Sequence, residues 1–262
     1  MSDKIDIDNS AMDEYDYMEL AHSAETADEA REYAEKALEK NKNFLDAKTF
    51  LLDFIDDNEQ MMKEYEKLIK KTEKQMEKDG LMSEDNIGSF WGIIETRPYM
   101  RLRHKYLMLL IETGKYGKAL SHCKDLLRLS ENDNMGVRYT AMALLAFFEK
   151  EEEAKALYKA YDENSMEMIF PLAVLYYKTD QYRQARKYVT KIYSMCDDIA
   201  EFLMDEDFQN EVIDAVLKQG MYQYGSAEQF ADVFINCNYL LVSTPGFMMW
   251  FVDEILKLED VE

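Results

Sequence analysis

A recurring alanine constrains the fold of this chain more than any other feature. Ala119 and Ala185 each end a Thr-x-x-Tyr-x-x-Ala segment, and they lie 66 positions apart. Ala154 lies between them, 35 positions after the first and 31 before the second, and Ala30 belongs to an earlier segment of the same kind. Apolar residues three to four apart follow these alanines, which is typical of helices. A period near 33 predicts a repeated supersecondary unit.

This spacing resembles the tetratricopeptide repeat, in which two antiparallel helices form a unit of about 34 residues. A small residue early in the second helix lets it approach the first closely. Helices this short cannot bury their apolar faces alone, so neighbouring pairs must stack. We therefore expect an all-α, tetratricopeptide-like helical-hairpin solenoid. The predicted helix pairs, about five in number, cover residues 13–42, 44–79, 99–132, 135–164 and 166–198.

Composition agrees with a helical chain. Only 9 glycines and 3 prolines are present, too few for the many tight turns of a β-sandwich or barrel. The apolar fraction of 47% argues against disorder, although 32% of the residues are charged.

Two regions depart from the repeat. Residues 80–98 form an insertion rich in glycine, serine and aromatic residues. Residues 199–262 are expected to hold an irregular acidic segment with short helical pieces, to about residue 225, followed by two C-terminal capping helices. Ser226 is the predicted N-cap of the first of these helices, with Gln229 in the capping-box position, and that helix is expected to run to about residue 242. We expect residues 1–12 to be an acidic N-terminal segment and residues 13–198 to hold the helix pairs. Together with residues 199–262 they are expected to form one continuous domain.

Three segments are similar to a bacterial family of tetratricopeptide-like proteins that is grouped with the suppressor-of-tumorigenicity proteins of animals. They are Phe-Trp-Gly-Ile-Ile-Glu-Thr-Arg-Pro-Tyr-Met-Arg at 90–101, Asn-Asp-Asn-Met-Gly-Val-Arg-Tyr at 132–139, and Tyr-Gly-Ser-Ala-Glu-Gln-Phe-Ala at 224–231 followed by Thr-Pro-Gly-Phe-Met-Met-Trp-Phe at 244–251. The chain lacks two prolines typical of the family, one near Ser130 and one within 196–208. The resemblance implies a fold and no particular chemistry.

The net charge of −22 is concentrated at the two ends. Residues 1–30 carry a net −9 and residues 197–262 a net −13, whereas the 166 residues between them are neutral. This charge excludes general electrostatic binding to nucleic acid or to anionic membranes. The acidic ends are either solvated faces that keep the protein soluble, or a docking surface for a basic partner that could also act as a decoy for nucleic acid.

The sequence predicts a cytoplasmic, non-catalytic protein. The N-terminus lacks the cationic start and apolar core of a secretory signal, and no apolar run approaches the roughly 18 residues that span a bilayer. Three widely spaced cysteines favour reduced thiols. No phosphate-binding loop is present, and His22, His104 and His122 have no ligands at metal spacing, so we expect no metal and no cofactor. His122 and Cys123 are adjacent, but neighbours on a helix point to different faces.

The resemblance to tetratricopeptide arrays also places a groove on the first helices of the pairs. A mixture of arginine and tyrosine with apolar residues is typical of a binding hot spot. An arginine can hold a carboxylate with two hydrogen bonds, and a tyrosine can hold an extended segment. We therefore expect a scaffold for a peptide or protein segment, with a carboxylate-bearing segment favoured. The alternative is that the arginines are structural and pair with groups of their own chain. The predicted groove residues are Arg97, Tyr99, Arg101, His104, Met108, Arg138, Tyr139, Phe170 and Tyr177.

Overall fold

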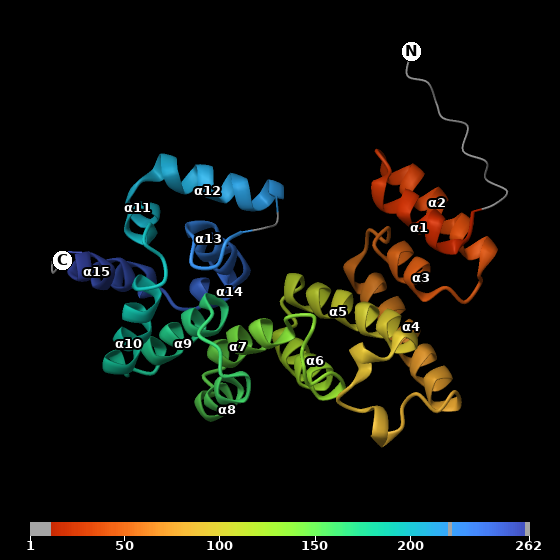
Figure 1. Ribbon diagram of the computed structural model, residues 1–262, viewed down its shortest axis with the longest axis horizontal. Coiled ribbons are helices and arrows are strands. Elements are labelled where there is room, and N and C mark those ends of the chain that lie inside the picture. Colours follow the sequence, from red (N-terminus) through yellow and green to blue (C-terminus); the bar gives the residue numbers. More distant parts are fainter. Residues whose placement is uncertain (1–11, 220–221, 260–262) are drawn as a thin grey trace, which may run out of the picture. The chain divides into compact units, whose positions relative to one another are not determined.

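The computed structural model describes residues 12–219 and 222–259. Its regular elements in these ranges are helices without β-strands, as the sequence predicts (Figure 1). No described helix is both long enough and apolar enough to cross a bilayer. The first ten α-helices are α1 (Glu14–Ser23), α2 (Ala27–Lys40), α3 (Leu45–Leu52), α4 (Asn58–Lys78), α5 (Arg97–Glu112), α6 (Tyr116–Leu129), α7 (Val137–Phe147), α8 (Glu151–Tyr161), α9 (Met166–Lys178) and α10 (Tyr182–Tyr193). The others are α11 (Ile199–Met204), α12 (Glu206–Gln219), α13 (Ala227–Asn236), α14 (Asn238–Val242) and α15 (Phe247–Glu259).

The first ten helices follow one another in the order expected for five helix pairs, although α5 begins at Arg97, two residues before the expected start of the third pair at 99. Each odd-numbered helix from α1 to α9 contacts the helix that follows it in the sequence. The alanines of the sequence repeat, Ala30, Ala119, Ala154 and Ala185, are all buried. A small side chain at this position allows the close packing of the second helix on the first.

The turns inside three of these pairs share one backbone geometry. A residue with a left-handed φ stands five positions before the alanine: Gly114 (+69°), Glu149 (+54°) and Asp180 (+59°). The next residue donates its backbone N–H to a carbonyl oxygen five positions back, at 2.8 Å in all three turns. This bond satisfies a carbonyl that the end of the first helix leaves open. The sequence repeat is therefore also a repeat of turn geometry.

The expected insertion at 80–98 holds three short 3-10 helices, η1 (Glu84–Asn86), η2 (Phe90–Gly92) and η3 (Ile94–Thr96), and its last two residues already belong to α5. Phe90 is fully buried, and the Thr96 hydroxyl donates to its carbonyl oxygen. Gly88, with a left-handed φ of +91°, accepts a hydrogen bond from the Glu131 backbone N–H at 2.9 Å. The insertion is thus a packed part of the structure around α5.

The chain divides into two compact units, where the sequence suggested one continuous domain. Unit 1 ends at Met135 and unit 2 begins at Gly136. The boundary lies in the Asn-Asp-Asn-Met-Gly segment, where Asp133 and Gly136 both have left-handed φ angles, of +45° and +70°. Unit 1 contains α1 to α6 and unit 2 contains α7 to α15.

The C-terminal part of unit 2 is more helical than the sequence suggested. Residues 206–219, where only short helical pieces were expected, form the 14-residue α12. The Asp205 side chain caps this helix by accepting hydrogen bonds from the backbone N–H groups of Asp207 and Phe208, at 2.9 and 3.0 Å. The helix expected from 227 to 242 is interrupted at Cys237 and becomes α13 and α14.

The predicted cap at Ser226 is confirmed. Its side-chain oxygen accepts from the Gln229 backbone N–H at 3.3 Å. The Gln229 side chain reaches back one residue further than a capping box requires, and accepts from the Gly225 backbone N–H at 2.7 Å.

Candidate binding site

A row of basic side chains follows one face of α5 in unit 1. Arg97, Arg101 and Lys105 are four residues apart, so they lie on neighbouring turns of the same face. Arg97 donates from Nε to the Trp91 carbonyl oxygen at 2.8 Å and lies over the Trp91 ring. Arg97 and Arg101 are predicted groove residues, whereas Lys105 was not predicted, and all three are half-buried.

Arg101 forms a two-pronged ion pair with Asp46 of α3. Its Nε lies 2.8 Å from Oδ1 and its Nη2 lies 2.6 Å from Oδ2. The Arg101 side chain is nevertheless 43% exposed. One turn further, Lys105 pairs with Asp53. Arg101 therefore has the internal partner that the structural interpretation of the arginines expects. It also leaves a large part of its side chain exposed to solvent.

A hollow of about 340 Å³ lies beside this row, between α4 and α5 and the end of α3. Met61, Met108 and Leu109 give it apolar walls, and Lys105 and Glu112 stand among its polar lining. Tyr65 also lines it and donates its hydroxyl to Asp53 at 2.8 Å. The hollow can accept an apolar side chain next to charged groups of both signs.

The other two predicted groove residues of unit 1 face the protein. Tyr99 is fully buried, and its hydroxyl donates to Glu73 Oε1 at 2.7 Å. His104 is half-buried, and burial lowers its pKa while the charge of Asp133 opposes that shift. The imidazole is therefore neutral at pH 7, and it adds no positive charge to the basic row.

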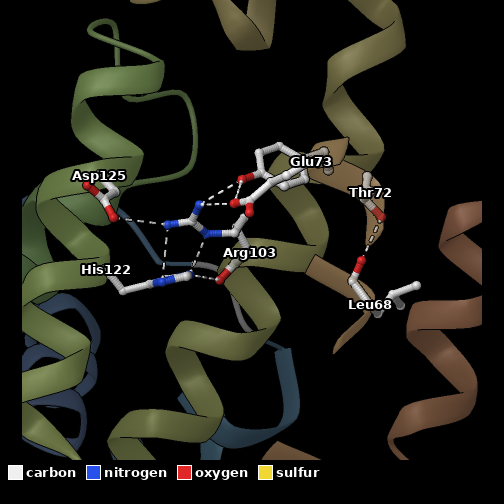
Figure 2. A network of polar contacts seen from close by, with 7 residues as sticks. Leu68, Thr72, Glu73, Arg103, His122 and Asp125 are labelled. Atoms are coloured by element: carbon white, nitrogen blue, oxygen red, sulfur yellow. Dashed lines mark hydrogen bonds and ion pairs between the residues drawn. The ribbon is translucent and has the colours of Figure 1, made fainter. Parts of the chain in front are cut away.

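The sequence analysis did not predict that Arg103 is buried beside Tyr99. The side chain of Arg103 is only 7% exposed, and Figure 2 shows its guanidinium between Glu73 of α4 and Asp125 of α6. Its Nη1 donates to the Tyr99 hydroxyl at 2.7 Å and lies 3.4 Å from Glu73 Oε1, while Nη2 lies 3.5 Å from Asp125 Oδ2. The signal was available, because Arg103 falls on the same helical stripe as core residues of α5. An arginine on that stripe needs internal partners.

His122 of α6 completes this network. Its Nε2 lies 2.9 Å from Arg103 Nε and 3.0 Å from the Arg103 carbonyl oxygen, and its Nδ1 lies 3.2 Å from Nη2. Burial and the charge of Arg103 lower the pKa of His122 to about 3. The imidazole is thus a neutral partner of a guanidinium that joins α4, α5 and α6. The neighbouring Cys123 is fully buried.

In unit 2, the predicted groove residues of α9, Phe170 and Tyr177, pack against the C-terminal helices of the chain itself. Phe170 was predicted to face a partner, but it is fully buried. Its ring lies 5.5 Å from that of Phe230 in α13, and 5.8 Å from those of Phe247 and Phe251 in α15, measured between centroids. Repeat spacing gives the direction of the Phe170 side chain but does not reveal that a distant segment occupies the space in front of it.

Tyr177 lies at the edge of the same aromatic cluster. Its ring centroid is 5.4 Å from Phe247 and 5.1 Å from Trp250, and it also packs edge-on against Tyr182. Tyr177 therefore stabilises the contact between α9 and α15 and packs against its own chain at the predicted groove.

Arg138 and Tyr139 lie near the start of α7 and form a separate corner of unit 2. Arg138 pairs with Glu163 through Nε (3.1 Å) and Nη2 (3.0 Å), and Nη2 also contacts the Tyr139 hydroxyl at 2.5 Å. The guanidinium lies 4.2 Å from the centre of the Tyr139 ring and 5.2 Å from that of Tyr161. Arg138 thus already holds a carboxylate of its own chain, whereas Tyr139 lines an open pocket.

The three cysteines of the chain lie within the part that the structure describes. Cys123, Cys196 and Cys237 are free thiols and buried. Burial raises their pKa values to about 12, 11 and 12, so the thiols are protonated at neutral pH. Among the described residues, no group of three or more histidine, cysteine and carboxylate side chains is placed to hold a metal ion. No protein-family model matches the sequence, and a search among curated proteins returns no match.

Proposed function

We propose that this chain is a non-catalytic, cytoplasmic scaffold with tetratricopeptide-like helix pairs, and that the α3–α5 face of unit 1 binds a protein segment. The α3–α5 face is defined by Arg101, Lys105 and Met108, together with the hollow beside them. The shared turn geometry of three pairs supports the tetratricopeptide-like array. The three buried, free thiols support a location in the cytoplasm, where thiols stay reduced. The observation that carries the binding proposal is that three N–H donors of Arg101 form no hydrogen bond with described residues, on the same face of α5 as Lys105 and Met108, which line the hollow.

Arg101 retains hydrogen-bonding capacity after it has paired with Asp46. A guanidinium has five N–H donors, and Asp46 takes two of them. The other three form no hydrogen bond with any described residue. A second carboxylate can therefore bind Arg101 without displacing Asp46. Lys105, one turn away, is paired with Asp53, so the three open N–H donors of Arg101 are what favours an acidic side chain in the ligand.

The hollow gives this face an apolar anchor point. Burial of an aliphatic side chain contributes about 1.5–3 kcal/mol, and a hydrogen bond to a charged group contributes about 1.5–3 kcal/mol. Met108 and Met61 line the hollow, and methionine side chains adapt to ligands of different shape. We expect the preferred segment to carry a leucine, isoleucine or phenylalanine close to an aspartate or glutamate.

Selection from a random peptide display library on the immobilised protein tests this proposal. The enriched peptides should combine an acidic with a large apolar residue. Arg101→Gln and Met108→Gln should each weaken their binding at least tenfold. Arg128→Gln is the matched control, because Arg128 is an exposed arginine on α6 of the same unit, and it should bind within twofold of the wild type. Circular dichroism melting verifies that the variants are folded.

The salt dependence separates this proposal from docking through the acidic ends. Peptide binding to a mixed apolar and polar hot spot should weaken only a few-fold between 50 and 500 mM NaCl, whereas a charge-driven complex weakens steeply. Enrichment of lysine-rich peptides with steep salt dependence would favour the acidic ends. Unchanged binding by both Arg101→Gln and Met108→Gln would refute the α3–α5 face.

A further inference from the structure

Unit 2 contains a second hollow, of about 380 Å³, where the segment before α13 meets the start of α7 and the α8–α9 loop. Its lining includes three tyrosine side chains and the carboxylate of Glu167. We call it the tyrosine pocket, defined by Tyr139, Tyr222, Tyr224, Glu167 and Gln229. Its volume is within the range of small-ligand sites, at the lower end.

Hydrogen bonds hold two of the tyrosines in place while their rings stay uncovered. Tyr224 donates its hydroxyl to the Asn164 carbonyl oxygen at 2.9 Å, although the residue is 70% exposed. The Tyr222 hydroxyl lies 3.1 Å from Glu167 Oε1 and 3.4 Å from Asp232 Oδ2. Aromatic rings that are fixed and exposed to solvent offer faces on which a ligand can stack.

The pocket also contains negative charge that no described cation neutralises. Gln229 donates from Nε2 to both oxygens of Glu167, at 2.9 and 3.1 Å, and Glu167 forms no ion pair within the described ranges. Glu163 differs, because Arg138 neutralises it at 3.0 Å. Next to the pocket, burial and the charge of Glu167 raise the pKa of Asp232. The single Tyr222 hydroxyl is shared by two carboxylates that repel one another.

We propose that the tyrosine pocket binds an alkylammonium group, supplied by a lysine side chain of a partner protein segment. A cation within about 6 Å of an aromatic face is attracted by the ring. The Tyr139 ring already faces the Arg138 guanidinium at 4.2 Å, so the ammonium would contact the rings of Tyr222 and Tyr224 and the carboxylate of Glu167. The same charge repels carboxylate and phosphate ligands. The preference is thus opposite to that of the α3–α5 face and does not depend on it, since the two sites lie in different units.

Nuclear magnetic resonance titration of the full-length protein tests this site with defined probes. Nα-acetyl-lysine methylamide should shift the Gln229 side-chain amide signals and saturate. Nα-acetyl-norleucine methylamide, which has a similar length and no charge, should bind at least tenfold more weakly. Equal binding of the two probes would overturn the proposal.

Variants assign the binding to the pocket. Glu167→Gln should weaken binding of the lysine derivative at least tenfold, and Glu211→Gln, an exposed glutamate of α12 with the same charge change, should leave it within twofold. Tyr224→Ala should weaken binding about fivefold or more, whereas Tyr224→Phe keeps the ring but loses the hydrogen bond to Asn164 and should weaken binding less than Tyr224→Ala does. Because Tyr224 is exposed, its variants test the site without disturbing the core. Unchanged binding by both Glu167→Gln and Tyr224→Ala would overturn the assignment.

The source of the ammonium group is tested with two further probes. The pentapeptide acetyl-Ala-Ala-Lys-Ala-Ala-amide should bind more tightly than cadaverine, because a segment adds contacts along the rim of the pocket. Tighter binding of cadaverine would overturn the assignment to a partner segment and indicate a free amine.

Discussion

Replacing His122 by asparagine should remove a defined part of the pH dependence of stability. In the folded chain His122 is buried beside the Arg103 guanidinium, and its pKa is lowered to about 3. In the unfolded chain a histidine titrates near 6.5. Because the folded pKa is the lower one, the stabilisation is fully present above pH 6.5 and is lost as the pH falls toward 3.

The magnitude follows from the two pKa values. Each unit of difference corresponds to about 1.4 kcal/mol. Between pH 7 and pH 5 the unfolded imidazole becomes almost fully protonated while the folded one stays neutral, which costs about 2 kcal/mol of stability. Asparagine does not titrate, and its amide can still accept from the guanidinium and donate to the Arg103 carbonyl. The loss of stability between pH 7 and pH 5 should therefore be about 2 kcal/mol smaller in His122→Asn than in the wild type.

Urea unfolding at pH 7, 6 and 5 measures this difference. Trp91 lies in unit 1 and Trp250 in unit 2. A Trp250→Phe background therefore makes fluorescence report on unit 1, which contains His122. His104, whose pKa is also lowered, is present in both proteins and cancels in the comparison. Parallel pH profiles for the two proteins would refute the role assigned to the Arg103–His122 contact.

Three further substitutions test the packing. Phe170→Ala should lower the free energy of unfolding of unit 2 by about 4 kcal/mol, because it leaves a cavity under α13 and α15. The Trp250 fluorescence transition in urea measures this loss of stability, and a loss below about 1 kcal/mol would contradict the packing. Ser226→Ala should cost about 1 kcal/mol by removing the cap of α13, measured in the same way. Gly225→Ala should cost more than about 1 kcal/mol, because its φ is +80° and an added Cβ would lie 2.5 Å from the Met195 carbonyl oxygen; a melting temperature equal to that of the wild type would contradict this.

The local features of the fold were predictable from the sequence because they depend on near neighbours. Ala119, Ala154 and Ala185 indicated where second helices begin, and Ser226 marked the start of α13. The spacing of small and apolar residues encodes helix pairs directly. The 14-residue α12 was missed because its acidic composition masked the Asp205 cap and the buried Val212 and Val216.

The candidate sites were less predictable because they depend on contacts between distant residues. Arg101 pairs with Asp46, 55 positions away, and Arg138 with Glu163, 25 positions away. No periodicity of one helix indicates which carboxylate of another helix will face it. Phe170 shows the same limit, because its position on α9 was inferred from the repeat, while the rings that cover it belong to residues 60 or more positions later.

The most direct test of the proposed function is hydrogen–deuterium exchange of the protein with and without a library-selected peptide. Bound peptide should slow exchange in α3 and α5, around Asp46, Arg101 and Met108, and Arg101→Gln should abolish this protection at the same peptide concentration. Protection confined to unit 2, with α3 and α5 unchanged, would contradict the assignment of the binding face.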